Sequence, residues 1–483
     1  VAGAVLFACL PQLLVPPLER NQFAVEIYFP EGTALAKNAE TVRDFSGILR
    51  SDKRVTDVIS FVGTSSPRFH TLYAPQMPAK NYSQLIVITD TFDNAEKVMR
   101  EYDARYRDYF PNAHLRFKQL SFLSAEAPLE VRISGDSIEE IKTFADRVRK
   151  IMAEEEDIIW LRDDYRNYLL GVDLDMDKEA ANRLGLTRGM LGASAALNRN
   201  GLPVGVVWDG DYAKNVVLKY EEAKTSSPQK LGDQYVGAPM SPKPVLLRQV
   251  SELKPSFSEG QVVRRNGRLT LTLRGDVAFG KLAAPVFSRI SKRIKALEKP
   301  GSVNVSYGGE YDMSLEIYEP FIKALITGII LIFLILLFQF RTARIAFLVM
   351  ATMPLSLVGS MFGLFLLGFP FGMTCFIGLI GLFGMVVRNG VILISYAHEL
   401  EHGGMSVKEA AFAAGKRRLR PIFLTASAAA VGVIPLITSG SLLWGPLGTV
   451  ICFGLIGSTI LTLYVLPVAY WRLGETKAVR GEA

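Results

Sequence analysis

The chain has 483 residues, 49% of them hydrophobic and 21% charged, with a formal net charge of +7. This composition is typical neither of a purely soluble protein nor of a purely membranous one, so we expect regions of both kinds. The three cysteines, Cys9, Cys375 and Cys452, lie in apolar segments without disulfide or metal-site spacing, which excludes a disulfide-rich scaffold.

Residues 1–15 are apolar but too few to cross a bilayer, which takes about 20 residues in a helix. No basic stretch precedes them, so they do not resemble a signal peptide. We interpret them as the second half of a cut membrane helix and expect the chain to be a fragment of a longer protein.

Residues 16–125 have the pattern of a soluble α/β unit. Alternating apolar residues from Phe23 to Phe29 predict a half-buried strand, and the residues after it keep one apolar helical face. Further apolar segments predict two strands, a helix and a last strand at residues 55–62, 85–89, 95–109 and 115–117. The order βαββαβ is that of a split βαβ, or ferredoxin-like, sandwich.

A second unit of the same type is predicted from residues 126–171 and 265–316, with residues 172–264 inserted as a separate subdomain. Its first helix is expected to begin at a capping box made by Ser137 and Glu140. Inside the insertion, Asp209-Gly210 predicts a hairpin turn between strands at residues 204–208 and 216–220.

Residues 317–474 contain five apolar stretches long enough to cross a membrane as helices. They lie at residues 321–340, 343–367, 372–396, 421–442 and 447–471. Lys and Arg gather in the first and third connections and in the tail of residues 475–483, whereas the second and fourth connections carry no charge. The positive-inside rule places the basic side in the cytoplasm, so we expect a bacterial inner-membrane protein with residues 16–316 in the periplasm.

Arg388 and Asn389 lie in the middle of one apolar stretch, residues 374–398. A central Arg costs at least about 2.5 kcal/mol on insertion, and such residues usually face a bundle interior and mark an ion or proton pathway. The alternative is an Arg that snorkels to the membrane surface, for which Arg388 lies too deep. Gly381 and Gly384 share its helical stripe, where small residues let another helix approach closely.

The residues from His398 to His402 match H-E-x-x-H, the zinc-binding helix motif of metalloproteases. Two His at i and i+4 can bind zinc and a Glu can activate water, so an intramembrane zinc protease is an alternative function. No third ligand is evident and Gly403-Gly404 follows at once, so the other interpretation is a solvated helix end. We predict no metal site and no cofactor.

Four stretches together resemble the C-terminal half of a resistance-nodulation-division (RND) efflux transporter. They are PPLERNQFAVEIYFPEGTAL, APLEVRISGD, GMVVRNGVILISYAHEL and RRLRPIFLTASAAAVGVIPL, which begin at Pro16, Ala127, Gly384 and Arg417. The resemblance covers essentially the whole chain and is greater to the hydrophobe/amphiphile exporters than to the heavy-metal branch. It implies a proton-driven multidrug efflux pump, which is a secondary transporter and not an enzyme.

The resemblance also implies a proton relay in the membrane part. In the family, two aspartates of the N-terminal half are paired with a Lys, an Arg and a Thr of the C-terminal half, which here correspond to Arg388, Arg418 and Thr425. We assign Asn389 to the same relay. Arg388 stands where Lys is common, and because Arg does not release a proton in a protein, we expect a fixed counter-charge.

Each relay residue has a structural alternative. Arg418 is otherwise a positive charge at the membrane edge, and the Thr425 hydroxyl is otherwise bonded to its own helix. The apolar stretches have no central Asp or Glu, so the titrating groups are expected on the missing half and the fragment alone is expected to be inactive in transport.

Substrate in this family passes a cleft beside the first ferredoxin-like unit, crossed by a flexible loop. The matching loop is residues 63–78, with Ile59, Phe61, Phe69 and Tyr73 as candidate lining, because broad hydrophobic specificity favours aromatic walls. Ile59 and Phe61 are otherwise ordinary strand core, whereas Phe69 and Tyr73 lie among turn residues.

The resemblance implies several partners: the N-terminal half, two further copies in a homotrimer, membrane lipid, and a periplasmic adaptor and outer-membrane channel that dock near residues 172–264. No nucleic-acid partner is expected. A metal exporter is the alternative within the family, but the periplasmic Met residues are scattered and do not form a soft-ligand cluster. A lipid exporter and a non-transporting scaffold are further alternatives.

Overall fold

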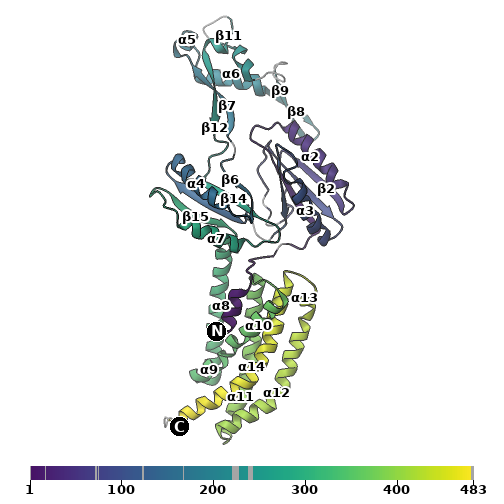
Figure 1. The fold of residues 1–483 in the computed structure, drawn as a ribbon, viewed down its shortest axis with the longest axis vertical. Coiled ribbons are helices and arrows are strands. Elements are labelled where there is room, and N and C mark those ends of the chain that lie inside the picture. The colour runs from purple at the N-terminus through teal and green to yellow at the C-terminus, as the bar shows by residue number, and fades with distance from the viewer. Residues whose placement is uncertain are drawn as a thin grey trace. The chain divides into compact units, whose positions relative to one another are not determined.

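The computed structural model describes residues 2–16, 18–70, 73, 75–121, 125–166, 168–219, 228–237 and 243–479 (Figure 1). The chain divides into two compact units. One consists of Val1–Asp164 with Val263–Ala483, and the other of Tyr165–Val262, which compares with the predicted insertion of residues 172–264.

The first sheet consists of β1 (Gln22–Tyr28), β2 (Val55–Val62), β3 (Tyr82–Thr89) and β4 (His114–Gln119), all antiparallel in the order β2-β3-β1-β4. Helix α2 (Leu35–Arg50) joins β1 to β2, and α3 (Phe92–Tyr106) joins β3 to β4. Helix α3 begins after Thr91, whose hydroxyl accepts a hydrogen bond from the Asn94 backbone. The described elements follow the predicted order βαββαβ along the chain.

Strand β1 is buried on both faces. One face, with Phe23, Val25 and Ile27, packs with α2 and α3 in a common core. The sequence predicts a half-buried strand, and this is wrong, because Ala24 and Glu26 on the other face are also buried. Loop and strand-end residues cover that second face, as described below for the site.

The second sheet consists of β5 (Leu129–Gly135), β6 (Ile158–Asp163), β13 (Arg264–Arg265), β14 (Arg268–Val277) and β15 (Asn304–Gly309). Strand β14 pairs with β5, β6 and β13, and β15 pairs with β5, all antiparallel. Helices α4 (Ile138–Ala153) and α7 (Ala283–Lys295) connect its strands. Strand β6 was not predicted as a separate element.

The predicted capping box at the start of α4 is not formed. Ser137 is the N-cap residue, but its hydroxyl makes no bond to the helix backbone and instead donates to the Glu139 carboxylate at 2.7 Å. Glu140 accepts from Ser302 instead of reaching back to the cap. The helix therefore starts where predicted, with a different pattern of hydrogen bonds.

The unit Tyr165–Val262 contains an antiparallel ribbon of β7 (Leu169–Met176) and β12 (Ser251–Ser258), helices α5 (Lys178–Arg183) and α6 (Arg188–Asn200), and a hairpin of β8 (Leu202–Asp209) and β9 (Tyr212–Leu218). Short strands β10 (Tyr235–Val236) and β11 (Val245–Leu246) pair with each other. The hairpin turns at Gly210, where φ is +59°, as the sequence predicts. The second strand starts earlier than predicted, and Tyr220 lies outside the described residues.

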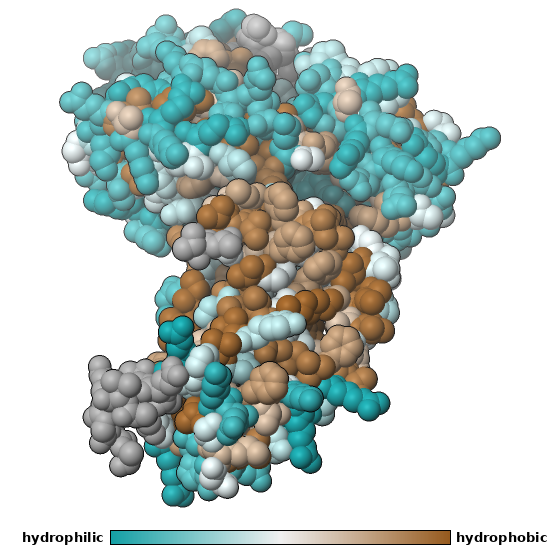
Figure 2. Space-filling model, turned by 60° about the horizontal axis from the view of Figure 1, so that its bottom comes forward, coloured by the Kyte–Doolittle hydropathy of each residue, from teal (hydrophilic) through white to brown (hydrophobic). Residues whose placement is uncertain are grey.

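Five helical segments among the described residues are long and apolar enough to cross a membrane: Glu310–Phe340, Ala343–Leu367, Met373–His402, Val407–Thr438 and Trp444–Leu473. Their helices are α8 (Glu310–Phe340), α9 (Ala343–Met350), α10 (Thr352–Leu367), α11 (Met373–His402), α12 (Val407–Gly432), α13 (Ile434–Thr438) and α14 (Trp444–Val479), and α1 (Ala2–Cys9) contacts α10. Figure 2 shows mainly hydrophobic side chains on the visible face of these helices.

Glycine allows close packing inside the bundle. A Cβ at Gly359 of α10 would lie 2.5 Å from the Phe453 carbonyl oxygen of α14, so a larger residue there would force the two helices apart. Ser360 also donates to the Val450 carbonyl at 3.0 Å. Helices α10 and α14 therefore form the tight centre of this part of the chain.

Candidate functional site

Arg388 lies near the middle of α11 on an exposed face of the helix. Its guanidinium makes no hydrogen bond or ion pair with any residue that the structure describes. A Cβ at Gly381 or Gly384 on the same stripe would meet no described atom within 4 Å, whereas at Gly378 it would lie 3.2 Å from Val450 of α14. Helix α11 thus packs with one face and presents a second face with small residues and one cation.

Asn389 points to the packed side of α11. It is 3% exposed, and its Oδ1 atom has no hydrogen-bond partner among the described residues. Residues one position apart on a helix do not face the same way, so the structure does not place Asn389 on the face of Arg388.

Arg418 and Thr425 lie on α12, which begins at Val407 and so extends well before the predicted span. The Arg418 guanidinium carbon lies 4.7 Å from the centre of the Tyr396 ring of α11, a cation–π distance. Its Nε is buried without a hydrogen-bond partner in the described chain. The Thr425 side chain is exposed, and its hydroxyl bonds the carbonyls of Pro421 and Ile422, both at 3.1 Å.

The H-E-x-x-H residues lie at the end of α11 and contact α14. His398 Nδ1 lies 3.3 Å from the Tyr470 hydroxyl, which donates to the Glu401 carboxylate. His402 Nδ1 lies 2.9 Å from the His398 carbonyl oxygen. Across the described ranges, no group of three or more His, Cys, Asp or Glu side chains is placed to hold a metal ion.

The four candidate substrate residues lie in two places along the chain, on β2 and in the loop that follows it. Ile59 is 43% exposed on β2, and Phe61 follows two residues later on the same face, half-buried, so Ile59 is not strand core. Phe69 and Tyr73 lie in the loop, with ring centres 5.1 Å apart. Tyr73 is only 6% exposed and packs on Ala24, and Thr71, Leu72 and Ala74 of the loop lie outside the described residues.

A buried charge cluster was missed by the sequence analysis. Arg116 of β4 makes a bidentate ion pair with Asp276 of β14, both bonds at 2.7 Å, and a third bond of 3.0 Å to Glu26 of β1. Burial by itself would raise the pKa of Glu26, but the charges of Arg116 and Lys118 outweigh burial and hold it at about 2. The available signal was Glu26 inside an apolar strand, which the alternation assigned to the solvent face.

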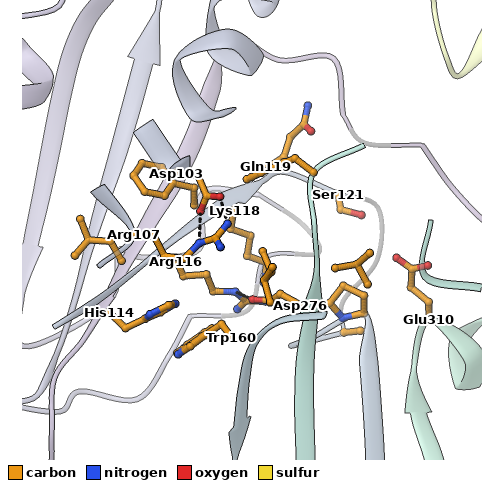
Figure 3. Close-up of a pocket in the computed structure, with 17 residues that line it drawn as sticks. Asp103, Arg107, His114, Arg116, Lys118, Gln119, Ser121, Trp160, Asp276 and Glu310 are labelled. Atoms are coloured by element: carbon orange, nitrogen blue, oxygen red, sulfur yellow. Dashed lines mark hydrogen bonds and ion pairs between the residues drawn. The ribbon is translucent and has the colours of Figure 1, made fainter. Parts of the chain in front are cut away.

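The cluster borders a pocket between β4 and the second sheet. In Figure 3, Arg116 and Asp276 point toward each other, with His114 and Trp160 beside them. The His114 and Trp160 rings stack with centres 4.4 Å apart, and burial lowers the pKa of His114 to about 4. The pocket holds about 180 Å³, which is smaller than the roughly 300 Å³ or more of a drug-sized site.

An irregularity in the second sheet lies next to this pocket. The pairing of β14 with β6 shifts register between Arg274 and Asp276, and Trp160 of β6 has a left-handed φ of +47°. The Arg162 guanidinium carbon lies 3.7 Å from the centre of the Trp160 ring. Bulges of this kind redirect side chains, and here the irregular stretch carries the carboxylate that reaches Arg116.

Comparison with known proteins decides the family. A family model described as the AcrB/AcrD/AcrF family matches residues 1–474. The chain belongs to this family. The swarming motility protein SwrC of Bacillus subtilis is 26% identical over 463 residues, covering 94% of this chain and 43% of that protein.

Other relatives are named for resistance to different kinds of compound. The cobalt-zinc-cadmium resistance protein CzcA of Cupriavidus metallidurans is 23% identical, covering 99% of this chain and 46% of that protein. The multidrug resistance protein MdtC of Klebsiella pneumoniae is 22% identical, covering 96% and 45%. The chain thus spans less than half the length of these relatives, and the narrower prediction of a hydrophobe exporter stays a prediction.

The fold of the chain also matches solved structures. The crystal structure of a heavy metal efflux pump superposes with a TM-score of 0.81 and 24% sequence identity, covering 98% of this chain and 50% of that one. At this identity the match shows the fold alone, which is the RND transporter fold with its apolar helices and mixed helix and strand content.

Proposed function

We propose that the chain forms the C-terminal half of a proton-driven efflux transporter of the bacterial inner membrane. The observation that carries the proposal is the Arg388 guanidinium on the open face of α11, which has no partner among the described residues. A cation in the middle of an apolar span is costly unless a charged or polar partner approaches it. The open face with Gly381 and Gly384 leaves space for helices that this chain does not contain.

The mechanism follows from the chemistry of the guanidinium. Arg388 stays protonated, so carboxylates on the missing half are the groups that bind and release protons. A deprotonated carboxylate is attracted to Arg388, and protonation removes most of that attraction. Arg418 and Thr425 of α12 are proposed to supply further polar groups to this relay, and Asn389 to contribute from the packed side of α11. The change in attraction moves the helices relative to each other.

Residues 16–316 are proposed to lie in the periplasm as two ferredoxin-like porter subdomains with an inserted docking subdomain. The strand order β2-β3-β1-β4 of the first sheet supports the ferredoxin-like assignment. A homotrimer with an adaptor and an outer-membrane channel is proposed from membership of the family, with the unit Tyr165–Val262 as the docking part.

The proposed substrates are hydrophobic or amphiphilic compounds. The exposed apolar surface of Ile59 beside Phe61 on β2 supports this choice. Export of metal ions is the second candidate, because several relatives are named for cobalt, zinc, cadmium or nickel resistance.

The test is efflux in susceptible cells that express this chain together with its N-terminal half. Arg388→Ala is compared with Arg420→Ala, an exposed Arg on α12, at matched expression. We expect loss of efflux and of its dependence on the proton gradient for Arg388→Ala only. A panel of hydrophobic dyes and of Co²⁺, Ni²⁺, Zn²⁺ and Cd²⁺ separates the two substrate classes, and efflux unchanged by Arg388→Ala would contradict the mechanism.

A further inference from the structure

Arg116 uses its whole guanidinium to join parts of the chain that are far apart in sequence. Nε and Nη2 donate to the two carboxylate oxygens of Asp276 at 2.7 Å each, and Nη1 donates to Glu26 Oε2 at 3.0 Å. Nη2 also donates to the Glu126 carbonyl at 2.6 Å, in the segment that leads from the first sheet to the second. Arg116 is 8% exposed, so these bonds replace water almost completely.

The bridge continues from Glu26 into the loop of residues 63–78. The Tyr73 hydroxyl donates to Glu26 Oε1, and the Gln84 amide donates to the Tyr73 hydroxyl at 2.9 Å. Gln84 in turn accepts the backbone N–H of Ser66 at 2.7 Å. Tyr73 is therefore bonded directly to the buried carboxylate, and Ser66 is linked to it through Gln84 and Tyr73.

The geometry has a consequence for movement. Asp276 belongs to the second sheet, whereas Glu26 and Arg116 belong to the first. If the two sheets separate, Arg116 cannot keep both carboxylates, since its Nε and Nη2 bonds point to one and its Nη1 bond to the other. A guanidinium left without Asp276 in this buried place draws in water or shifts toward Glu26, and either change alters the carboxylate that holds Tyr73.

We propose that Arg116 is a positioning residue that couples Tyr73, and Ser66 through Gln84, to the junction of the two sheets. With the sheets together, the bridge Asp276–Arg116–Glu26 fixes the carboxylate that holds Tyr73. With the sheets apart, that carboxylate shifts and Tyr73 is released. That this loop acts on substrate rests on the proposed transport function, whereas the coupling itself is a property of the bridge.

The coupling is tested by the labelling rate of a cysteine in the loop. The probe is Phe69→Cys with the exposed Cys9 changed to serine, in this chain assembled with its N-terminal half. We expect Asp276→Asn, a change in the other sheet, to raise the labelling rate at position 69 by at least about fivefold, the lower end of usual coupling between sites.

The matched control is Asp103→Asn. Asp103 is 5% exposed, lines the same pocket and pairs with Arg107, and it makes no hydrogen bond or ion pair with the described residues of the loop. We expect the labelling rate at position 69 in the Asp103→Asn variant to stay within twofold of the parent. Equal effects of Asp276→Asn and Asp103→Asn would overturn the proposal, because a general loosening of the pocket would then explain both.

A double-variant cycle tells whether Asp276 and Tyr73 act on the labelling rate together or independently. Tyr73→Phe removes the hydroxyl at the loop end of the bridge, so adding Asp276→Asn to it is expected to raise the rate little further. If the increase in the double variant equals the product of the two single increases, the two residues act independently and the coupling is overturned. If Asp276→Asn does not assemble, Arg116→Lys replaces it, and a labelling rate equal to the parent would contradict the proposal. Labelling requires no transport, so its failure is distinct from failure of the proposed pump.

Discussion

The Arg132 guanidinium of β5 donates to Asp312 Oδ2 in the first turn of α8 at 2.7 Å. Arg132 also pairs with Glu130 at 2.9 Å, and Glu130 contacts Arg274 of β14 at 3.4 Å. Helix α8 continues from this turn into the apolar span without a break. The ion pair therefore ties the start of a membrane helix to the second sheet.

This pair predicts a defect in transport that exceeds the defect in stability. Asp312 is partly exposed, so we expect Asp312→Asn to lower the free energy of unfolding by about 1 kcal/mol or less. Efflux by the assembled transporter is expected to fall several-fold, because motion of α8 is no longer passed to β5. The measurement is efflux at matched expression, with Asp146→Asn at an exposed position of α4 as the control. Equal efflux by both variants would contradict the prediction.

The stack of His114 on Trp160 predicts a pH-dependent stability. The pKa of His114 is lowered from 6.5 to about 4, so the unfolded chain binds a proton below pH 6.5 that the folded chain does not. The free energy of unfolding is therefore highest above pH 6.5 and falls as the pH is lowered from 6.5 to about 4. The total loss from this one group is on the order of 3 kcal/mol. His114→Phe is expected to make the unfolding midpoint less dependent on pH over this range. A pH dependence equal to that of the parent would contradict the lowered pKa of His114.

The contact of Arg418 with Tyr396 predicts a difference between two substitutions. Tyr396→Leu removes the ring under the guanidinium, with an expected loss of about 0.5 to 2 kcal/mol. Tyr396→Phe keeps the ring and is expected to stay close to the parent. Thermal unfolding of the purified, detergent-solubilised protein measures both, and equal losses would show that the ring face is not what Arg418 binds.

Substitutions of two glycines in the bundle are expected to have different effects, one on folding and the other on assembly. Gly359→Val places atoms against the Phe453 carbonyl and is expected to prevent folding of this chain. Gly384→Leu lies on the open face of α11 and is expected to leave the chain folded while blocking assembly with the N-terminal half. Co-purification of the two halves is the measurement. Normal assembly of Gly384→Leu would contradict a helix contact on that face.

The sequence was informative where one physical pattern dominates. The apolar runs predicted five spans, and the alternating and helical periods predicted the order of elements in the first sheet. The ends of the membrane helices were less predictable. Helices α8 and α12 extend beyond the apolar stretches into polar residues, which become helical because of packing. Because α12 starts at Val407, Arg418 lies within this helix and not before its first residue.

The buried charges show why the rest was not predictable from the sequence. Glu26, Arg116 and Asp276 are far apart in the chain, and each by itself has the pattern of a solvated strand residue. Glu26 and Arg116 are opposite each other in the β1–β4 ladder, and the packing of the second sheet adds Asp276 to the pair. Tyr73, a candidate for lining a substrate path, is 6% exposed and hydrogen-bonded to Glu26, which its place among turn residues did not indicate.

The central claim is that Arg388 acts as a fixed positive charge for carboxylates of the missing half. The most direct measurement is proton-gradient-dependent efflux by the assembled transporter with Arg388, Arg388→Lys and Arg388→Gln at matched expression. The account predicts that Lys, which keeps the charge, retains efflux, whereas Gln, which keeps hydrogen bonding without charge, abolishes it. Efflux by Arg388→Gln equal to that of the parent would contradict the account.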